Sequence, residues 1–95
     1  MKKLETYVRE ERFAEIHEEL RMASVGGLTF VKSYEPEYLD RLKLEMIVRD
    51  MDVEKVVGAI ARMSPTFSSW DSKVFLSPVE QVFDIASGQT GDRAI

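Results

Sequence analysis

The chain has 95 residues, a length that predicts one domain, and its 44% apolar and 32% charged shares are ordinary for a folded protein. It has no cysteine and one histidine, which excludes a disulfide framework, thiolate chemistry and a metal site built on histidines. A net charge of −4 disfavours nonspecific nucleic-acid binding, and no run approaches the roughly 20 apolar residues of a membrane span. Because Glu5 and Arg9 interrupt any apolar leader, we expect a cytoplasmic protein.

The first third of the chain predicts a strand, a helix and a second strand. Residues 3–9 alternate as in a half-buried strand, with one side formed by Leu4, Thr6 and Val8 and the other by Lys3, Glu5, Tyr7 and Arg9. Residues 10–23 change to helical spacing, with glutamates on the polar face and with Phe13, Ile16, Leu20 and Ala23 as the apolar stripe. His17 lies on the polar face, where we expect it to be exposed. We expect Gly26-Gly27 to stop the helix and residues 28–33 to form the second strand.

The second half of the chain repeats this order. A polar connection, residues 34–41, leads to a strand over residues 42–49. In this strand Leu42, Leu44, Met46 and Val48 alternate with Lys43, Glu45, Ile47 and Arg49. Asp50 or Asp52 is expected to cap a second helix, whose apolar stripe is Val53, Val56, Val57, Ile60 and Met63. Residues 64–72 are expected to form a loop and residues 73–76 a fourth strand. Residues 78–85 fit either a short helical turn or an edge strand, before a polar, glycine-containing tail.

The resulting order, β-α-β-β-α-β, predicts an α+β fold of the ferredoxin-like type. In this fold an antiparallel four-stranded sheet carries both helices on one face. We divide the single domain into a first βαβ half (residues 1–33), a connection (34–41), a second βαβ half (42–78) and a C-terminal segment (79–95). The connection is short enough to join two adjacent antiparallel strands as a hairpin loop.

Several patches of the chain follow one known pattern in the same order. Residues 1–9 (MKKLETYVR) match M-K-K-I-E-A-I-I-R, and residues 87–95 (SGQTGDRAI) match a closing T-G-E-x-G-E-D-A-I. Between them, residues 43–50, 53–60 and 73–80 match K-I-E-V-V-V-P-D, V-E-K-V-I-E-A-I and K-I-F-V-x-P-V-E. The chain therefore resembles the PII nitrogen-regulatory signal-transduction protein family over most of its length.

The resemblance implies a regulator and not an enzyme. Members of this family are trimers that bind ATP or ADP in clefts between subunits and regulate enzymes, transporters or other regulators. Their long T-loop, between the second and third strands, contacts targets and helps to hold 2-oxoglutarate with Mg-ATP. The family pattern places an adenine-binding role on Tyr7, Gly27, Thr29 and Ile47 and a phosphate-binding role on Lys73. No metal ligand set and no nucleophile–base pair is evident in the sequence, which agrees with a non-enzymatic role.

The chain also departs from the family pattern in three places. The G-F-G-R-Q-x-G start of the T-loop has no counterpart after Tyr34, so we expect that loop to be missing or very short. The glycine-rich B-loop, T-G-K-I-G-D-G-K, is replaced by residues 66–73 (TFSSWDSK), which lack glycine. Asp84 and Ala86 stand where the family has the two arginines of an R-I-R segment. The resemblance with these departures implies weak binding of ATP, ADP or AMP, or binding of a different small effector.

Each candidate has a plainer interpretation. Lys73 at a strand edge fits a solvated charge, Thr29 in a strand fits a packing residue, and Trp70 fits a ring folded over its own core. A structural PII-type trimer without sensing, or a CutA-type or ACT-type module, shares the same architecture. The glycine-containing C-terminus favours PII over the last two. The partners we expect are other copies of the chain in a homotrimer, a small-molecule effector and a regulated protein, with no nucleic acid.

Overall fold

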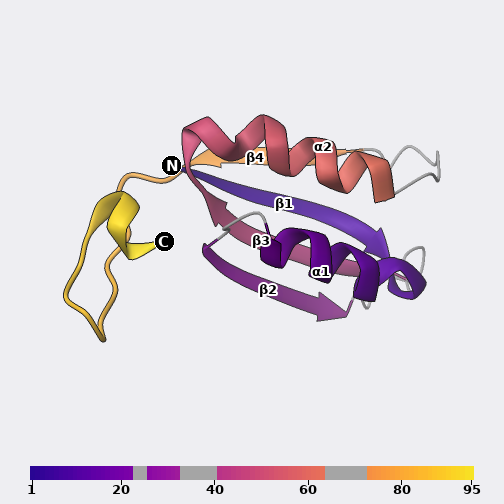
Figure 1. Cartoon of the computed structure of the whole chain (residues 1–95), viewed down its shortest axis with the longest axis horizontal. Helices are drawn as coiled ribbons and strands as arrows, with labels where there is room; N and C mark the ends of the chain where they lie inside the picture. The colour runs from indigo at the N-terminus through magenta and orange to yellow at the C-terminus, as the bar shows by residue number, and fades with distance from the viewer. Residues whose placement is uncertain (23–25, 33–40, 64–72) are drawn as a thin grey trace.

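The computed structural model describes residues 1–22, 26–32, 41–63 and 73–95. Four strands form one antiparallel sheet in the order β2-β3-β1-β4. Both helices lie on the same face of this sheet (Figure 1). The elements are β1 Lys2–Arg9, α1 Phe13–Met22, β2 Gly26–Lys32, β3 Arg41–Val48, α2 Val53–Met63 and β4 Val74–Pro78. The predicted ferredoxin-like α+β fold is confirmed.

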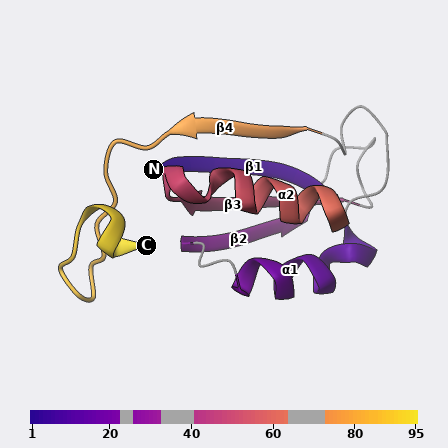
Figure 2. The same cartoon turned by 45° about the horizontal axis from the view of Figure 1, so that its top comes forward.

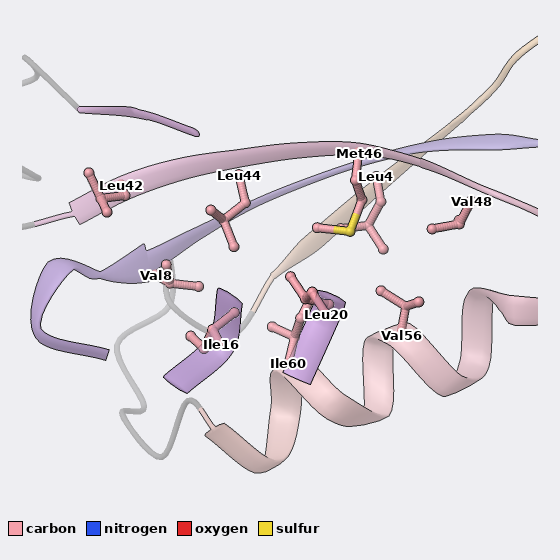
Figure 3. Close-up of a cluster of buried hydrophobic side chains, with 10 residues drawn as sticks. All are labelled: Leu4, Val8, Ile16, Leu20, Leu42, Leu44, Met46, Val48, Val56 and Ile60. Atoms are coloured by element: carbon pink, nitrogen blue, oxygen red, sulfur yellow. The ribbon is translucent and has the colours of Figure 1, made fainter. Parts of the chain in front are cut away.

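The core lies between the helices and the sheet, and it is built from the alternation seen in the sequence. Every second residue of β1 and β3 faces the helices, because successive side chains of a strand point to opposite faces. Leu4 and Leu44 are completely buried there, as are Leu20 of α1 and Val56 of α2. The cluster comprises Leu4, Val8, Ile16, Leu20, Leu42, Leu44, Met46, Val48, Val56 and Ile60 (Figure 3).

The end of α1 and the start of β2 differ from those predicted. The helix α1 ends at Met22, and Gly26 and Gly27 already belong to β2, which has a register irregularity between Gly26 and Thr29. Glycine is common at such bulges because it lacks a side chain to pack. Residues 33–40 and 64–72, to which the short T-loop, the B-loop and Trp70 were assigned, lie outside the described residues.

The capping prediction for the second helix is wrong. A 3-10 turn, Asp50–Asp52, precedes α2, and its N-cap is Arg49, which makes no side-chain capping hydrogen bond. Both aspartates lie inside the first turn, where a carboxylate still suits the positive end of the helix dipole. The Asp50 carboxylate instead pairs with the Met1 amino group at 3.1 Å and with Lys2 Nζ at 3.5 Å.

Residues 79–95, here called the C-terminal arm, form neither the helical turn nor the edge strand expected for residues 78–85. The arm extends away from the sheet beyond the end where β1 begins (Figures 1 and 2). It folds back on itself through an isolated bridge between Phe83 and Thr90 and ends in a 3-10 turn, Gly91–Ala94. Gly88 and Gly91 have φ values of 74° and 67°, which glycine adopts without steric cost.

No helix within the described ranges is long and apolar enough to cross a membrane.

Candidate functional site

The sheet has a second face, opposite the helices, which we call the open face. The strand register fixes its occupants, because residues paired across strands point to the same side. Lys3 pairs with Ile47, Glu5 with Glu45 and Tyr7 with Lys43, and none of these side chains lies in the core. Thr29 and Val31 of β2 extend the same rows through their pairing with Glu45 and Lys43. Three of the candidate residues, Tyr7, Thr29 and Ile47, therefore share the open face.

Four half-buried charges occupy the centre of the open face. The Lys3 ammonium lies 2.9 Å from Glu5 and 4.0 Å from Glu45, and the Lys43 ammonium lies 3.6 Å from Glu5 and 3.0 Å from Glu45. The hydrogen bond from Lys3 lowers the pKa of Glu5, and the hydrogen bond to Glu45 raises the pKa of Lys43. The two positive and two negative charges compensate one another, so the centre of the face is neutral.

One end of the open face, which we call the Tyr7 end, is basic. Tyr7 pairs with Lys43 across β1 and β3. Lys73 directly precedes Val74, the first residue of β4, which pairs with Thr6, so Lys73 lies across from Tyr7. The Thr6 hydroxyl donates a 2.8 Å hydrogen bond to the Lys73 carbonyl and thereby anchors this point.

The Tyr7 end also contains two residues that the sequence analysis did not select. Arg9 and Arg41 are register partners in adjacent strands, and Arg41 is only 7% exposed. Nε of Arg9 and Nη1 of Arg41 are both buried. Among the described residues, Arg9, Arg41 and Lys73 give this end positive charge, and arginine matches carboxylate and phosphate geometry. Alternation placed Arg9 on this face, but only the strand pairing reveals that Arg41 lies beside it.

The opposite end, which we call the Ile47 end, is small and apolar. Ile47 pairs with Gly26 of β2 as well as with Lys3, and Gly27 follows within the register irregularity. Thr29 is exposed and pairs with Glu45. A backbone without side chains beside an isoleucine allows a flat apolar group to approach closely.

The two ends are separated within one chain. Lys43, the partner of Tyr7, and Ile47 lie four residues apart on β3, which corresponds to about 13 Å along a strand. The charged centre of the open face lies between them. In the strand register, Tyr7 and Lys73 thus lie at one end and Gly27 and Ile47 at the other, while Thr29 lies beside Glu45 of the charged centre.

Comparison with known proteins gives one consistent result. A family model described as nitrogen regulatory protein P-II matches residues 1–89. The chain is 32% identical to the nitrogen regulatory protein P-II of Cereibacter sphaeroides and 31% identical to that of Microchaete diplosiphon. It is 28% identical to that of Azospirillum brasilense, and in all three cases the comparison covers the whole of both chains. The chain belongs to the nitrogen regulatory protein P-II family.

The P-II relatives are longer than this chain. The comparisons extend over 112 residues and the chain has 95, so at least 17 positions of the relatives have no counterpart here. The short or missing T-loop that we expect after Tyr34 stays a prediction.

In the C-terminal arm Asp84 has a structural role that comparison with the family pattern did not suggest. Oδ1 of Asp84 accepts hydrogen bonds from the amides of Ala86 at 3.0 Å and Ser87 at 3.4 Å. The hydrogen bond with the Ser87 side chain and these two amide bonds lower the pKa of Asp84. The carboxylate thus closes a local turn of the kind that aspartate favours. The spacing of Asp84 and Gly88 is the sequence signal that could have revealed this turn.

The structure shows no metal-binding arrangement in the part of the chain that it describes. No group of three or more histidine, cysteine, aspartate or glutamate residues converges there.

Proposed function

We propose that this P-II family member is a signal-transduction protein that works as a homotrimer. In this proposal it binds a small anionic effector, an adenine nucleotide or another metabolite, in clefts between its subunits. Effector binding then regulates a partner protein in nitrogen or related metabolism. The names of its relatives, all nitrogen regulatory protein P-II, support the regulatory role.

One observation supports the proposal: in the strand register, the candidate residues Tyr7 and Ile47 lie toward opposite ends of the open face. The apolar Ile47 end suits a planar base, and the cationic Tyr7 end suits a phosphate or carboxylate. Within one chain they are about 13 Å apart. When the Tyr7 end of one subunit faces the Ile47 end of the next, both halves meet in one cleft, and a closed ring repeats this contact at every interface.

A second candidate function, a structural trimer that has lost nucleotide sensing, is favoured by the arm. Asp84 and Ala86 supply no positive charge where the family pattern has two arginines, and the Asp84 carboxylate is engaged in its own turn. Each charge-assisted hydrogen bond is worth roughly 1.5–3 kcal/mol, so two missing contacts predict ATP affinity lower by orders of magnitude.

Calorimetry on the whole chain with ATP, ADP, AMP and 2-oxoglutarate distinguishes the two functions. Effector sensing predicts measurable binding of at least one of these compounds, weakened at least tenfold by Lys73→Ala. Glu80→Ala, an exposed change on the arm, serves as the control and should leave binding intact. Light scattering of the same samples should give the mass of three chains. Binding of none of the four compounds by a stable trimer would favour the structural role, and a stable monomer would contradict both.

A further inference from the structure

Two carboxylates lie opposite each other in the middle of the open face. Glu5 of β1 and Glu45 of β3 are register partners, and their side chains are 29% and 30% exposed. Like charges that face each other across two strands destabilise a sheet. This pair therefore needs counter-ions on the open face itself, because the other face of the sheet is occupied by the apolar core.

Lys43 is a shared counter-ion of this pair. Its Nζ lies 3.0 Å from Oε1 of Glu45 and 3.6 Å from Oε2 of Glu5. The second lysine, Lys3, lies 2.9 Å from Glu5 but 4.0 Å from Glu45. Glu45 therefore relies mainly on Lys43, and the hydrogen bond between them is the main cause of the raised pKa of that lysine.

The place of Lys43 in the sheet would also allow its charge to serve the Tyr7 end. Lys43 is the register partner of Tyr7, and the next pair along the same face is Arg9 with Arg41. The ammonium group of a lysine sits on a flexible four-carbon stem and can turn toward either neighbouring row. Here it turns toward the two glutamates, so its charge is compensated at the centre of the open face and is not added to the Tyr7 end.

We propose that Glu45 is a specificity-determining residue that holds Lys43 away from the effector and so limits the negative charge that the Tyr7 end accepts. This inference rests on the proposed function, in which the Tyr7 end binds the anionic part of the effector. With Lys43 held back, the open face suits an effector with one phosphate or carboxylate group better than a triphosphate. A protein can discriminate between related ligands in this way, by denying one of them a charge that it needs.

Calorimetry on the full chain with AMP and ATP tests the proposal, at one ionic strength because salt screens exposed charges. Glu45→Gln should raise ATP affinity by about tenfold and AMP affinity by about threefold, because the released lysine reaches the longer phosphate chain. In the Lys43→Met background the same change should raise ATP affinity by less than about threefold. Glu5→Gln, which removes the more distant carboxylate from Lys43, should give a smaller gain. Glu54→Gln, at an exposed position of α2, changes the net charge equally and should leave affinity unchanged.

The outcomes separate this inference from the proposed function. If the wild-type chain binds AMP, ADP, ATP or 2-oxoglutarate and Glu45→Gln does not improve ATP binding, this inference is overturned and the proposed function stands. Equal gains with and without Lys43 would also overturn it, because the effect would then come from the lost carboxylate alone. If Glu45→Gln does not fold, as judged by circular dichroism, Glu5→Gln with and without Lys43→Met decides the question in the same way. Binding of none of the four compounds by the wild-type chain or any variant would overturn the proposed function and this inference together.

Discussion

Thr6 is the residue at which the core meets the candidate site, and its hydroxyl offers a sharp test. The side chain is 1% exposed on the helix-facing side of β1, and Oγ1 donates to the Lys73 carbonyl at 2.8 Å. This hydrogen bond connects residues 67 positions apart and fixes the start of β4. We predict that Thr6→Val frees the start of β4 and displaces Lys73 from the Tyr7 end.

The magnitude follows from the loss of one hydrogen bond at constant shape. A typical intramolecular hydrogen bond contributes about 0.5–1.5 kcal/mol net, and an acceptor left buried and unsatisfied costs about 1–3 kcal/mol. Because Lys73 is exposed, water can reach its carbonyl, so we expect Thr6→Val to lower the free energy of unfolding by about 1 kcal/mol. Thr6→Ser keeps the hydroxyl and removes one buried methyl group, which costs about 0.8 kcal/mol.

The two variants should therefore have similar global stability and different local behaviour. Amide hydrogen exchange should become faster in β4 for Thr6→Val. The exchange rates of β3 amides should change only by the amount that the lower global stability explains. Thr6→Ser should show no such excess in β4. Effector affinity should fall in Thr6→Val alone. Equal exchange of β4 in both variants would refute the argument that this hydroxyl positions Lys73.

Three further predictions concern the core, the charged centre of the open face and the arm. Leu44→Ala, at a completely buried position, should lower the free energy of unfolding by about 2–5 kcal/mol in urea denaturation, and a loss below about 1 kcal/mol would contradict the described core. Lys3→Met should raise the pKa of Glu5 toward its ordinary value in an NMR titration. Because the folded-state pKa of Glu5 is lowered, the stabilisation from its carboxylate is present above the ordinary carboxyl pKa and is lost as the pH falls through the folded-state pKa. An unchanged pKa of Glu5 in Lys3→Met would show that Lys3 is not the main partner of Glu5. Asp84→Ala should accelerate exchange of the Ala86 amide, which loses its 3.0 Å acceptor, and unchanged exchange would mean that the turn forms without it.

The faces of the strands could be predicted from the sequence, because a period of two residues assigns each side chain to one side of a sheet. Alternation placed Leu4 in the core and put Tyr7 and Ile47 on the opposite side, as the structure confirms. Position along that face could not be predicted, because it depends on strand register. The register shows that Tyr7 and Ile47 belong to different ends of the open face.

The structure of the C-terminal arm could not be predicted from the sequence, for a different reason. Its alternation is weak and its hydrogen bonds are local, so residues 78–85 fitted a helical turn and an edge strand equally well. The structure is decided by the Asp84 turn and by Arg49, whose partner Asp92 is 43 residues away. Restoring positive charge with Asp84→Arg would also remove a turn acceptor. Ala86→Arg, which keeps Asp84, is therefore the cleaner test of the missing phosphate contacts.

The measurement that tests the central claim most directly is complementation between two inactive variants. Lys73→Ala damages the Tyr7 end and Ile47→Asp damages the Ile47 end. Each should weaken binding of whichever of ATP, ADP, AMP or 2-oxoglutarate the wild-type chain binds by at least tenfold, to a level not detected at the ligand concentration chosen for the calorimetry. After the two variants are unfolded and refolded together in equal amounts, about a quarter of the clefts should regain binding, because random assortment around a closed ring places two intact halves together at that frequency. Recovery of binding at that level would support a cleft built from two subunits. Trimers that form from the mixture and recover no binding would contradict it.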